Sequence, residues 1–228
     1  MIITIDGPAG AGKSTVAKEL AKRLGFSYLD TGAMYRALTL KALKQKVNLH
    51  DEQALVDLAE GTTIDLLADE KQSLKVLLDG RDVTMAIRSV EVTNNTFYIA
   101  RAPRVRQIMV DWQRRIGEKS NIVVEGRDAG TVIFPKADKK FYLDADFEER
   151  VKRRLKDLKT QGQSSNRSAL QQELQERDTK DLTRSVGPLK KAEDAVVIDA
   201  THLSVEEVVE SMLKILRQQR KKMGSHLF

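Results

Sequence analysis

The sequence contains no cysteine, which excludes disulfide bonds and thiolate metal sites. Its three histidines, His50, His202 and His226, lie too far apart in the chain to suggest a zinc-type cluster. No apolar run approaches the roughly 20 residues that span a bilayer, and no basic segment with a cleavage site opens the chain. We therefore expect a cytoplasmic protein that does not bind a membrane.

Proline and glycine are also scarce, with 4 and 13 residues, whereas 41% of the residues are hydrophobic and 32% are charged. This balance excludes collagen-like and disordered chains and indicates a folded globular protein. Because typical domains have about 150 residues, a chain of 228 residues predicts one domain with an insertion, or two small domains.

Acidic residues are outnumbered by basic ones, 33 to 39, and the net charge of +6 predicts an anionic partner. The basic residues gather in three segments, residues 101–115, 148–191 and 214–222. Each segment could simply be the solvated face of a helix, and we expect the third to complement a helix dipole. Aromatic residues make up only 5% of the chain, too few to favour binding of single-stranded nucleic acid by stacking.

The strongest signal is a phosphate-binding motif near the start of the chain. Residues 2–6 form a β-branched run that predicts a strand, and apolar residues recur at helical spacing from residue 16 to Gly25, which suits a helix C-terminus. Between them the chain matches G-x-x-x-x-G-K-[ST] at every fixed position. The motif consists of Gly7, Pro8, Ala9, Gly10, Ala11, Gly12, Lys13 and Ser14, and Thr15 follows it.

The residue types of this loop match the chemistry of a nucleoside triphosphate. Its glycines let backbone N–H groups curl around phosphate oxygens, and the helix N-terminus adds partial positive charge there. We expect Lys13 to reach the β- and γ-phosphates and the Ser14 hydroxyl to ligate Mg²⁺. The N-K-x-D sequence of guanine-specific switch proteins is absent. A small kinase or a small nucleic-acid-dependent ATPase remains.

The rest of the chain predicts an α/β fold. Five apolar segments predict strands of one parallel sheet flanked by helices, at residues 2–5, 26–29, 121–124, 140–143 and 195–198. Ligands of such sheets bind beyond the carboxyl ends of the strands. An acidic residue follows each strand, namely Asp6, Asp30, Glu125, Asp144 and Asp199. Several of these could face the site, while we expect Asp144 and Asp199 to cap the next helices.

An insertion with a different pattern lies between the second and third strands. Residues 62–67, 74–78 and 82–83 predict a small antiparallel sheet, with a hairpin turn at residues 79–80. Residues 101–116 predict a helix with Pro103 in its first turn and an apolar stripe that buries Trp112 in the core.

Helices dominate the last third of the chain. Asp146 and Glu149 predict a capping box that opens one helix, and Ser204 and Glu207 predict another at the start of the last helix. Polar residues 161–166 interrupt the pattern and resemble the tip of a mobile lid, after which a helix resumes at Ser168.

Three further segments carry a family resemblance. They are Asp-Thr-Gly-Ala-Met-Tyr-Arg at residues 30–36, Glu-Gly-Arg-Asp-Ala-Gly-Thr at 125–131, and Glu-Arg-Asp at 176–178 followed by Asp181, Arg184, Pro188 and Leu189. With the phosphate-binding loop, this set resembles the bacterial cytidylate kinases from residue 2 to about residue 216. Adenylate, guanylate and thymidylate kinases share the loop but lack the first two segments.

The resemblance implies the nucleoside monophosphate kinase fold and transfer of the γ-phosphoryl group of ATP to CMP or dCMP, with Mg²⁺. It implies a monomer with a single kinase domain over residues 1–228. The core would comprise residues 1–36, 118–146 and 188–222, the monophosphate-binding insertion about 37–117, and the helical lid about 147–187.

The resemblance also implies roles for individual residues. Arg36, Arg127 and Arg184 would hold the acceptor phosphate, while Lys13, Arg150 and Arg154 would act on the donor side. Thr31, Arg177 and Asp181 would hold the ribose region, Arg106 and Asp128 would read the cytosine edge, and Tyr35 would either approach the acceptor or pack at a helix start. The chemistry agrees, because an acceptor phosphate needs no catalytic base and arginine forks bind phosphate oxygens in pairs. An aspartate can accept from the exocyclic amine of cytosine, where uracil has a carbonyl.

Two residues depart from the family pattern. Phe97 stands where the family usually offers a small hydroxyl residue to the base. Glu125 stands where the family mostly has aspartate, and it keeps the charge with one more methylene as a candidate to reach Mg²⁺ through water.

Three alternatives stay open at this stage. The acceptor could include UMP, the chain could be a nucleic-acid-binding ATPase, or it could be a scaffold without turnover. Acidic residues interleave with the basic segments and aromatics are few, so we expect no nucleic-acid partner. We interpret the first two basic segments as arginines gathered over one phosphate site, and the presence of Lys13, Ser14 and the motif arginines disfavours a scaffold.

Overall fold

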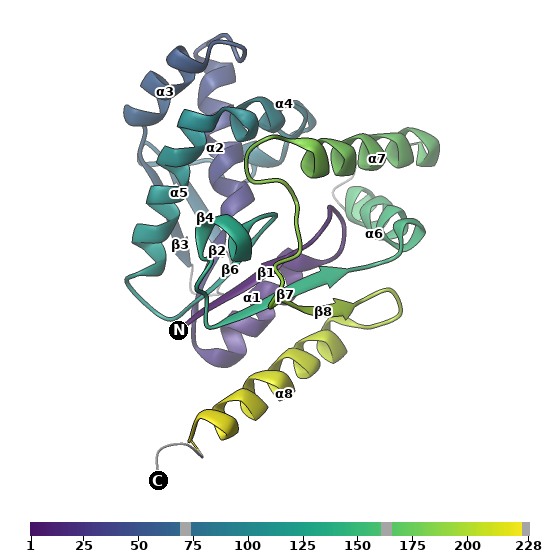
Figure 1. The fold of residues 1–228 in the computed structure, drawn as a ribbon. Helices are drawn as coiled ribbons and strands as arrows, with labels where there is room; N and C mark the ends of the chain where they lie inside the picture. The colour runs from purple at the N-terminus through teal and green to yellow at the C-terminus, as the bar shows by residue number, and fades with distance from the viewer. Residues whose placement is uncertain (69–73, 161–165, 225–228) are drawn as a thin grey trace.

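A five-stranded parallel sheet forms the centre of the computed structural model, which describes residues 1–68, 74–160 and 166–224, with side chains as far as residue 219 (Figure 1). Its strands are β1 (Ile2–Asp6), β2 (Ser27–Asp30), β6 (Ile122–Gly126), β7 (Lys139–Asp144) and β8 (Val196–Asp199), in the order β2-β6-β1-β7-β8. All four neighbouring pairs are parallel. The predicted α/β fold and its five strands are confirmed.

The two faces of the sheet carry separate hydrophobic cores, because successive side chains of a strand point to opposite faces. In β6, Val123 packs into one core, whereas Ile122 and Val124 pack into the other. The first core contains α1 (Lys13–Leu24) and α8 (Val205–Gly224). The second contains α2 (Thr31–Lys44), α3 (Glu52–Glu60), α4 (Val90–Arg101) and α5 (Pro103–Gly117). Trp112 is half-buried against this second core, as predicted.

One predicted helix boundary is wrong. The helix expected over residues 101–116 begins at Pro103, and Arg101 instead ends α4. Ala102 between them is extended, with φ −72° and ψ 111°. A residue before proline is pushed out of the helical region, whereas proline itself suits the first helical position, so the chain breaks into two helices here.

The insertion contains the expected antiparallel sheet, formed by β3 (Ile64–Ala68), β4 (Leu74–Leu78) and β5 (Arg81–Asp82) in that order. The turn at Asp79 and Gly80 has φ values of 50° and 76°, as a two-residue hairpin turn requires. A short 3₁₀ turn, η1 (Ala86–Arg88), then leads into α4. The insertion packs beside the large sheet through α2, which contacts both β4 and β6 (Figure 1).

Two helices stand apart from the sheet, α6 (Phe147–Thr160) and α7 (Arg167–Thr183) (Figure 1). They share a small core in which Val151, Leu158, Leu170 and Leu174 surround Ala9 of the phosphate-binding loop. The helix expected to resume at Ser168 begins at Arg167, capped by Asn166. The predicted lid tip at residues 161–165 lies outside the described residues, as do the side chains of Arg220, Lys221 and Lys222 in the C-terminal basic segment.

The capping predictions have mixed outcomes. Ser204 and Glu207 form the expected reciprocal box. Asp146 caps α6 by accepting from the Glu148 N–H, but Glu149 does not reach back, because the Asp146 N–H donates to Thr201 Oγ1. Asp144 and Asp199 cap no helix; they accept from backbone N–H groups in the turns that follow their strands. None of the described helices is both long and apolar enough to cross a bilayer.

Candidate active site

A cleft of about 2000 Å³ opens above the carboxyl ends of β1, β2 and β6. Most of the predicted site residues line it: Ala9, Gly10, Ala11, Gly12, Lys13, Ser14, Thr15, Thr31, Tyr35, Arg36, Arg106, Arg127, Asp128, Arg154, Arg177, Asp181 and Arg184. Gly7, Pro8 and Arg150 do not. Since this volume exceeds the range of about 300–1,000 Å³ usual for one small ligand, the cleft has room for two.

The phosphate-binding loop forms one end of the cleft. Gly7, Gly10 and Gly12 have φ values of 153°, 78° and 95°, which side chains rarely adopt. A Cβ on Gly7 would lie only 2.0 Å from the Leu143 carbonyl oxygen, so the loop packs directly on the backbone of β7. The Lys13 ammonium donates to the Pro8 carbonyl oxygen at 2.7 Å. Burial, together with the nearby Arg127, lowers the pKa of Lys13 to about 7.

Beside this loop, a carboxylate binds the motif serine. Ser14 Oγ donates to Glu125 Oε2 at 2.9 Å, and the Tyr28 hydroxyl donates to Glu125 Oε1. Burial and the neighbouring Asp30 raise the pKa of Glu125. No group of three or more histidine, aspartate or glutamate side chains within residues 1–68, 74–160 and 166–219 could hold a metal ion. A hard cation such as Mg²⁺ would therefore need oxygens from a bound anion and from water in addition to those of Ser14 and Glu125.

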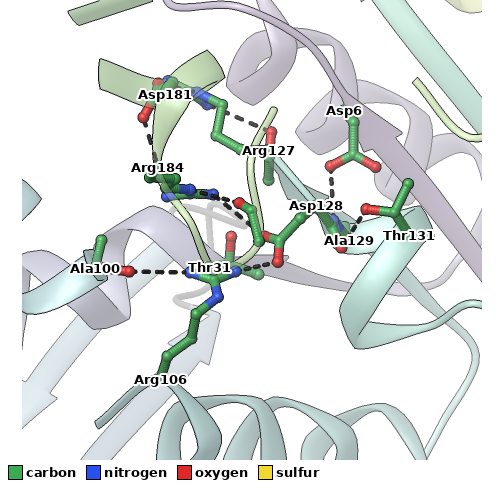
Figure 2. Close-up of polar contacts among 12 residues, drawn as sticks. Asp6, Thr31, Ala100, Arg106, Arg127, Asp128, Ala129, Thr131, Asp181 and Arg184 are labelled. Carbon is green, nitrogen blue, oxygen red and sulfur yellow. Dashed lines mark hydrogen bonds and ion pairs between the residues drawn. The ribbon is translucent and has the colours of Figure 1, made fainter. Parts of the chain in front are cut away.

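The other end of the cleft is a network of ion pairs around Asp128 (Figure 2). Arg106 pairs with Asp128 Oδ2, and both side chains are at most 5% exposed. Arg184 approaches the other oxygen at 3.7 Å. Arg106 also lies 5.6 Å over the ring of Tyr35, whose buried hydroxyl has no partner among the described residues.

Arginines from three different segments connect the two ends. Arg127 Nε donates to Asp181 Oδ2 at 2.8 Å (Figure 2), and Arg36 donates to Asp30 at 3.0 Å. Although burial opposes the shift, Arg127 and Arg177 hold the pKa of Asp181 below its usual range. Burial and the charge of Arg127 lower the pKa of Arg177 to about 10. Within the described part of the chain, Arg177 and Arg154 make no ion pair, so their guanidinium groups are available to an anion.

Comparison with known proteins identifies the family. The model of the family described as cytidylate kinase matches residues 3–218. The chain is 52% identical to the cytidylate kinase of Desulforamulus reducens, covering 92% of this chain and 94% of the relative. It is 51% identical to the cytidylate kinase of Geobacillus sp. strain WCH70, covering 95% and 96%.

The chain belongs to the cytidylate kinase family.

The resemblance found in the sequence is thereby confirmed, and with it membership of an enzyme class, the kinases. A gluconokinase from Sinorhizobium meliloti 1021 has a similar structure, with a TM-score of 0.50 and 14% identity over 99% of this chain and 97% of that protein. At this identity the likeness concerns the fold alone, and it agrees with the predicted kinase fold.

One member of the predicted cytidylate kinase site is already engaged. Arg150 donates to the Ala9 and Ala145 carbonyl oxygens at 2.9 and 3.1 Å and pairs with Asp178 at 2.6 Å. It therefore ties α6 and α7 to the phosphate-binding loop instead of presenting a free cation to the cleft.

The interpretation of the first basic segment is largely wrong. Among residues 101–115, only Arg106 lines the cleft. Arg114 donates to the Ile133 and Val132 carbonyl oxygens, and Arg104 binds Gln53. Most of these arginines satisfy protein oxygens, which a count of charges along the chain cannot distinguish from a phosphate site.

Sequence reasoning also missed two residues of the site. Tyr28 orients Glu125, and Arg153 of α6 donates to the Ala11 carbonyl oxygen of the loop at 3.3 Å. Arg153 lies beside Arg154 in the second basic segment. The cluster of basic residues therefore indicated both arginines, but it could not tell which of them binds the loop. Tyr28 lies two residues before Asp30 on a strand edge and carried no signal of its own.

Proposed function

We propose that this chain transfers the γ-phosphoryl group of ATP to CMP or dCMP by direct in-line transfer, giving ADP and CDP or dCDP. The observation that carries the proposal is the buried Arg106–Asp128 pair facing the same cleft as Lys13. One polar pair suited to the cytosine edge and one phosphate-binding loop share a cleft large enough for both nucleotides. Family membership supports the same activity.

The donor end would hold ATP by its phosphates. The backbone N–H groups of the loop and the N-terminus of α1 would surround the β- and γ-phosphates, and the Lys13 ammonium would reach the same phosphates. Arg153 and Arg150 of α6 hold the loop through the carbonyl oxygens of Ala11 and Ala9. Arg154, which has no ion pair in the described chain, would reach the donor phosphates.

The acceptor end would hold the monophosphate by its three chemical parts. Arg36, Arg127 and Arg184 would bind its phosphate, Thr31, Arg177 and Asp181 its ribose region, and Arg106 and Asp128 its base, beside Tyr35. The acceptor phosphate is already anionic, so no side chain needs to remove a proton. These residues instead bring two anions into line and balance the charge that spreads over the transferring group.

A divalent cation fits the oxygen atoms beside the loop. We propose Mg²⁺, with the Ser14 hydroxyl as ligand and Glu125 within reach through water, because hard oxygens suit this ion and kinases usually complete its shell with phosphate oxygens. When bound, the ion would neutralise charge on the β- and γ-phosphates. Tyr28 would keep the Glu125 carboxylate turned toward Ser14.

We further propose how the chain divides this work. Residues 37–117 would form the monophosphate-binding insertion on a core of residues 1–36, 118–146 and 188–222, and residues 147–187 would form a lid that closes to exclude water. The separate small core of α6 and α7 supports the lid assignment. The enzyme would act as a monomer in the cytoplasm, where its nucleotide substrates are found.

A panel of monophosphates tests the proposed reaction. ADP release from ATP is measured with CMP, dCMP, UMP, AMP, GMP and no acceptor, and we expect CMP and dCMP to accelerate it far above the rate with water alone. If neither does, the proposal fails. If UMP matches CMP, the enzyme is a broader pyrimidine kinase.

A salt titration tests the nucleic-acid alternative. Oligonucleotide binding is measured between about 50 and 200 mM salt, because the release of counterions from nucleic acid alters affinity over this range. We expect weak binding, whereas tight binding with a steep salt dependence would favour the ATPase.

A further inference from the structure

A buried aspartate at the end of β1 links the two ends of the cleft. Asp6 is 4% exposed and directly precedes Gly7, the first residue of the phosphate-binding loop. Its Oδ1 accepts from the Ala129 N–H at 2.8 Å and its Oδ2 from the Gly130 N–H at 2.7 Å. Figure 2 shows the carboxylate pointing at the residue that follows Asp128. Both oxygens therefore bind the acceptor side, while the backbone of Asp6 continues into the donor loop.

The two N–H groups open a π-helical turn, η2 (Ala129–Ile133), in which Asp128 is the capping residue. The Asp128 carbonyl oxygen accepts from the Val132 N–H at 2.9 Å and the Ile133 N–H at 3.2 Å. The first N–H groups of a helical turn have no partner inside it. Asp6 supplies both partners, with a negative charge at the end of the turn where it is favourable.

The opposite end of η2 is held from α5. Arg114 Nε donates to the Ile133 carbonyl oxygen at 2.9 Å, and Arg114 Nη2 donates to the Val132 carbonyl oxygen at 2.8 Å. The Asp6 carboxylate of β1 and the Arg114 guanidinium of α5 thus hold the two ends of the turn. What the turn presents to the cleft is the Asp128 carboxylate, between Arg106 and Arg184.

An ordinary structural cap would not need a buried charge. Burial raises the pKa of Asp6 to about 6, against the favourable effect of the two backbone N–H groups. A neutral side chain could accept one of these bonds without that penalty. The Asp6 carboxylate accepts both bonds with one rigid group, and it packs so closely on the turn that a Cβ on Gly130 would lie 3.2 Å from Asp6 Oδ2.

We propose that Asp6 is a positioning residue that sets Asp128 relative to the phosphate-binding loop, so that the base of the acceptor and the phosphates of the donor are held in register. The proposal rests on the proposed kinase activity. Its consequence is selective, because a shift of Asp128 disturbs the acceptor and its base, whereas the backbone contacts that hold ATP phosphates remain. A misplacement of about 1 Å is enough to reduce turnover by about 100-fold.

The test is Asp6→Asn in the full chain, which keeps the shape of the side chain but faces one N–H with an amide group. We expect KM for CMP to rise by about tenfold or more, KM for ATP to change by less than about threefold, and the preference for CMP over UMP to fall. The matched control is Asp138→Asn, because Asp138 accepts from the Ile2 N–H at 2.6 Å at the opposite end of the same strand. The control should leave all three parameters unchanged.

Hydrogen exchange gives a readout that does not need turnover. In the substrate-free protein, peptides covering residues 128–134 should exchange faster in Asp6→Asn than in the wild type or in Asp138→Asn. If the wild-type protein has no CMP kinase activity, the proposed function is wrong. If hydrogen exchange of residues 128–134 is unchanged in Asp6→Asn, this inference is wrong. Equal losses for CMP and ATP would also overturn it, because they would indicate a purely structural cap.

A second variant covers the case in which Asp6→Asn does not fold. Arg114→Gln loosens the same turn from its other end, where the half-buried side chain donates to the carbonyl oxygens of Ile133 and Val132. We expect KM for CMP to rise by about threefold to tenfold with KM for ATP unchanged. An unchanged KM for CMP in a folded Arg114→Gln protein would overturn the proposal.

Discussion

The two ends of the cleft are built in opposite ways. The donor end is one contiguous loop, in which Gly7, Gly10 and Gly12 turn the backbone itself into the binding surface. The acceptor end is assembled from side chains of α2, α5, α7 and the β6–η2 junction, and ion pairs hold it together. A backbone site is specified locally, whereas a side-chain site depends on the packing of several elements. Changes at the two ends should therefore fail in different ways.

Arg184→Ala should separate the two ends most strongly. Arg184 has 6% side-chain exposure and lies between Asp128 and Asp181, so its loss removes a cation from the acceptor phosphate and one of the two arginine partners of each carboxylate. We expect kcat to fall by about 100-fold or more while the affinity for ATP changes little. Single-turnover kinetics and ATP titration measure the two quantities, and an unaffected kcat would remove Arg184 from the site.

Gly7→Ala should give the converse result. The added methyl group would meet the Leu143 carbonyl oxygen, and the φ of 153° is unfavourable to alanine, so the loop must shift. We expect KM for ATP to rise by about tenfold and stability to fall by about 1–3 kcal/mol, with little change in binding of CMP alone.

Gly25→Ala is the control for this change. Gly25 also has a positive φ, 66°, but no atom lies within 4 Å of the added methyl group. It should lose about 1 kcal/mol of stability without any kinetic effect. Calorimetry with ATP and with CMP decides, and an equal loss for both ligands in Gly7→Ala would contradict the local view of the donor end.

The pH dependence of stability tests Asp6, which lies between the two ends. Burial raises the pKa of Asp6 from 3.8 to about 6, so the folded state holds this proton more tightly than the unfolded state. The stability that this group contributes is present below about pH 4 and is lost as the pH rises through about 6. Relative to Asp6→Asn, the wild type should lose about 2 kcal/mol of unfolding free energy between pH 4 and pH 7. Urea unfolding measures this, and a constant difference would refute the shift.

Lys180→Gln should have the smallest effect. The Lys180 ammonium of α7 lies 5.7 Å from the ring centroid of Phe97 on α4, across the mouth of the cleft. An exposed contact of this type contributes about 0.5–1 kcal/mol, so KM for CMP should change by less than about fivefold at constant kcat. Lys159→Gln, an exposed lysine of α6 outside the cleft, is the control. A larger rise in KM for CMP would show that Phe97, which departs from the family pattern, belongs to the acceptor site.

The contrast between the two ends also explains what the sequence could predict. The phosphate-binding loop and the five strands follow from local patterns, namely fixed glycine spacing and short β-branched runs, and both are found as expected. Helix α4 was not placed, because its β-branched and asparagine residues have weak helix propensity. Its one signal was Ser89, whose side chain accepts from the Val92 N–H.

The acceptor side shows where local patterns stop. The sequence motifs name Arg106 and Asp128, but their pairing depends on how α5 packs against η2. Arg150 was expected to face the donor phosphates and instead binds Ala9 and Asp178, since a carbonyl oxygen can satisfy a guanidinium as well as a phosphate can. The cap on η2 joins Asp6 to Ala129 and Gly130, which follow it by 123 and 124 positions in the chain, so no local sequence pattern could predict it.

The paired arginines have a consequence for selectivity among anions. Asp30 and Asp178 each bind one arginine, whereas Asp181 and Asp128 each bind two. A nucleotide phosphate that binds one of these paired arginines must compete with its carboxylate, whereas Arg177 and Arg154 make no ion pair within the described part of the chain. A buried carboxylate that loses its arginine is left as a costly unpaired charge, so the competing phosphate must reach the arginine at a similar depth. We expect this competition to weaken the binding of polymers that carry the same phosphate groups, even at a net charge of +6.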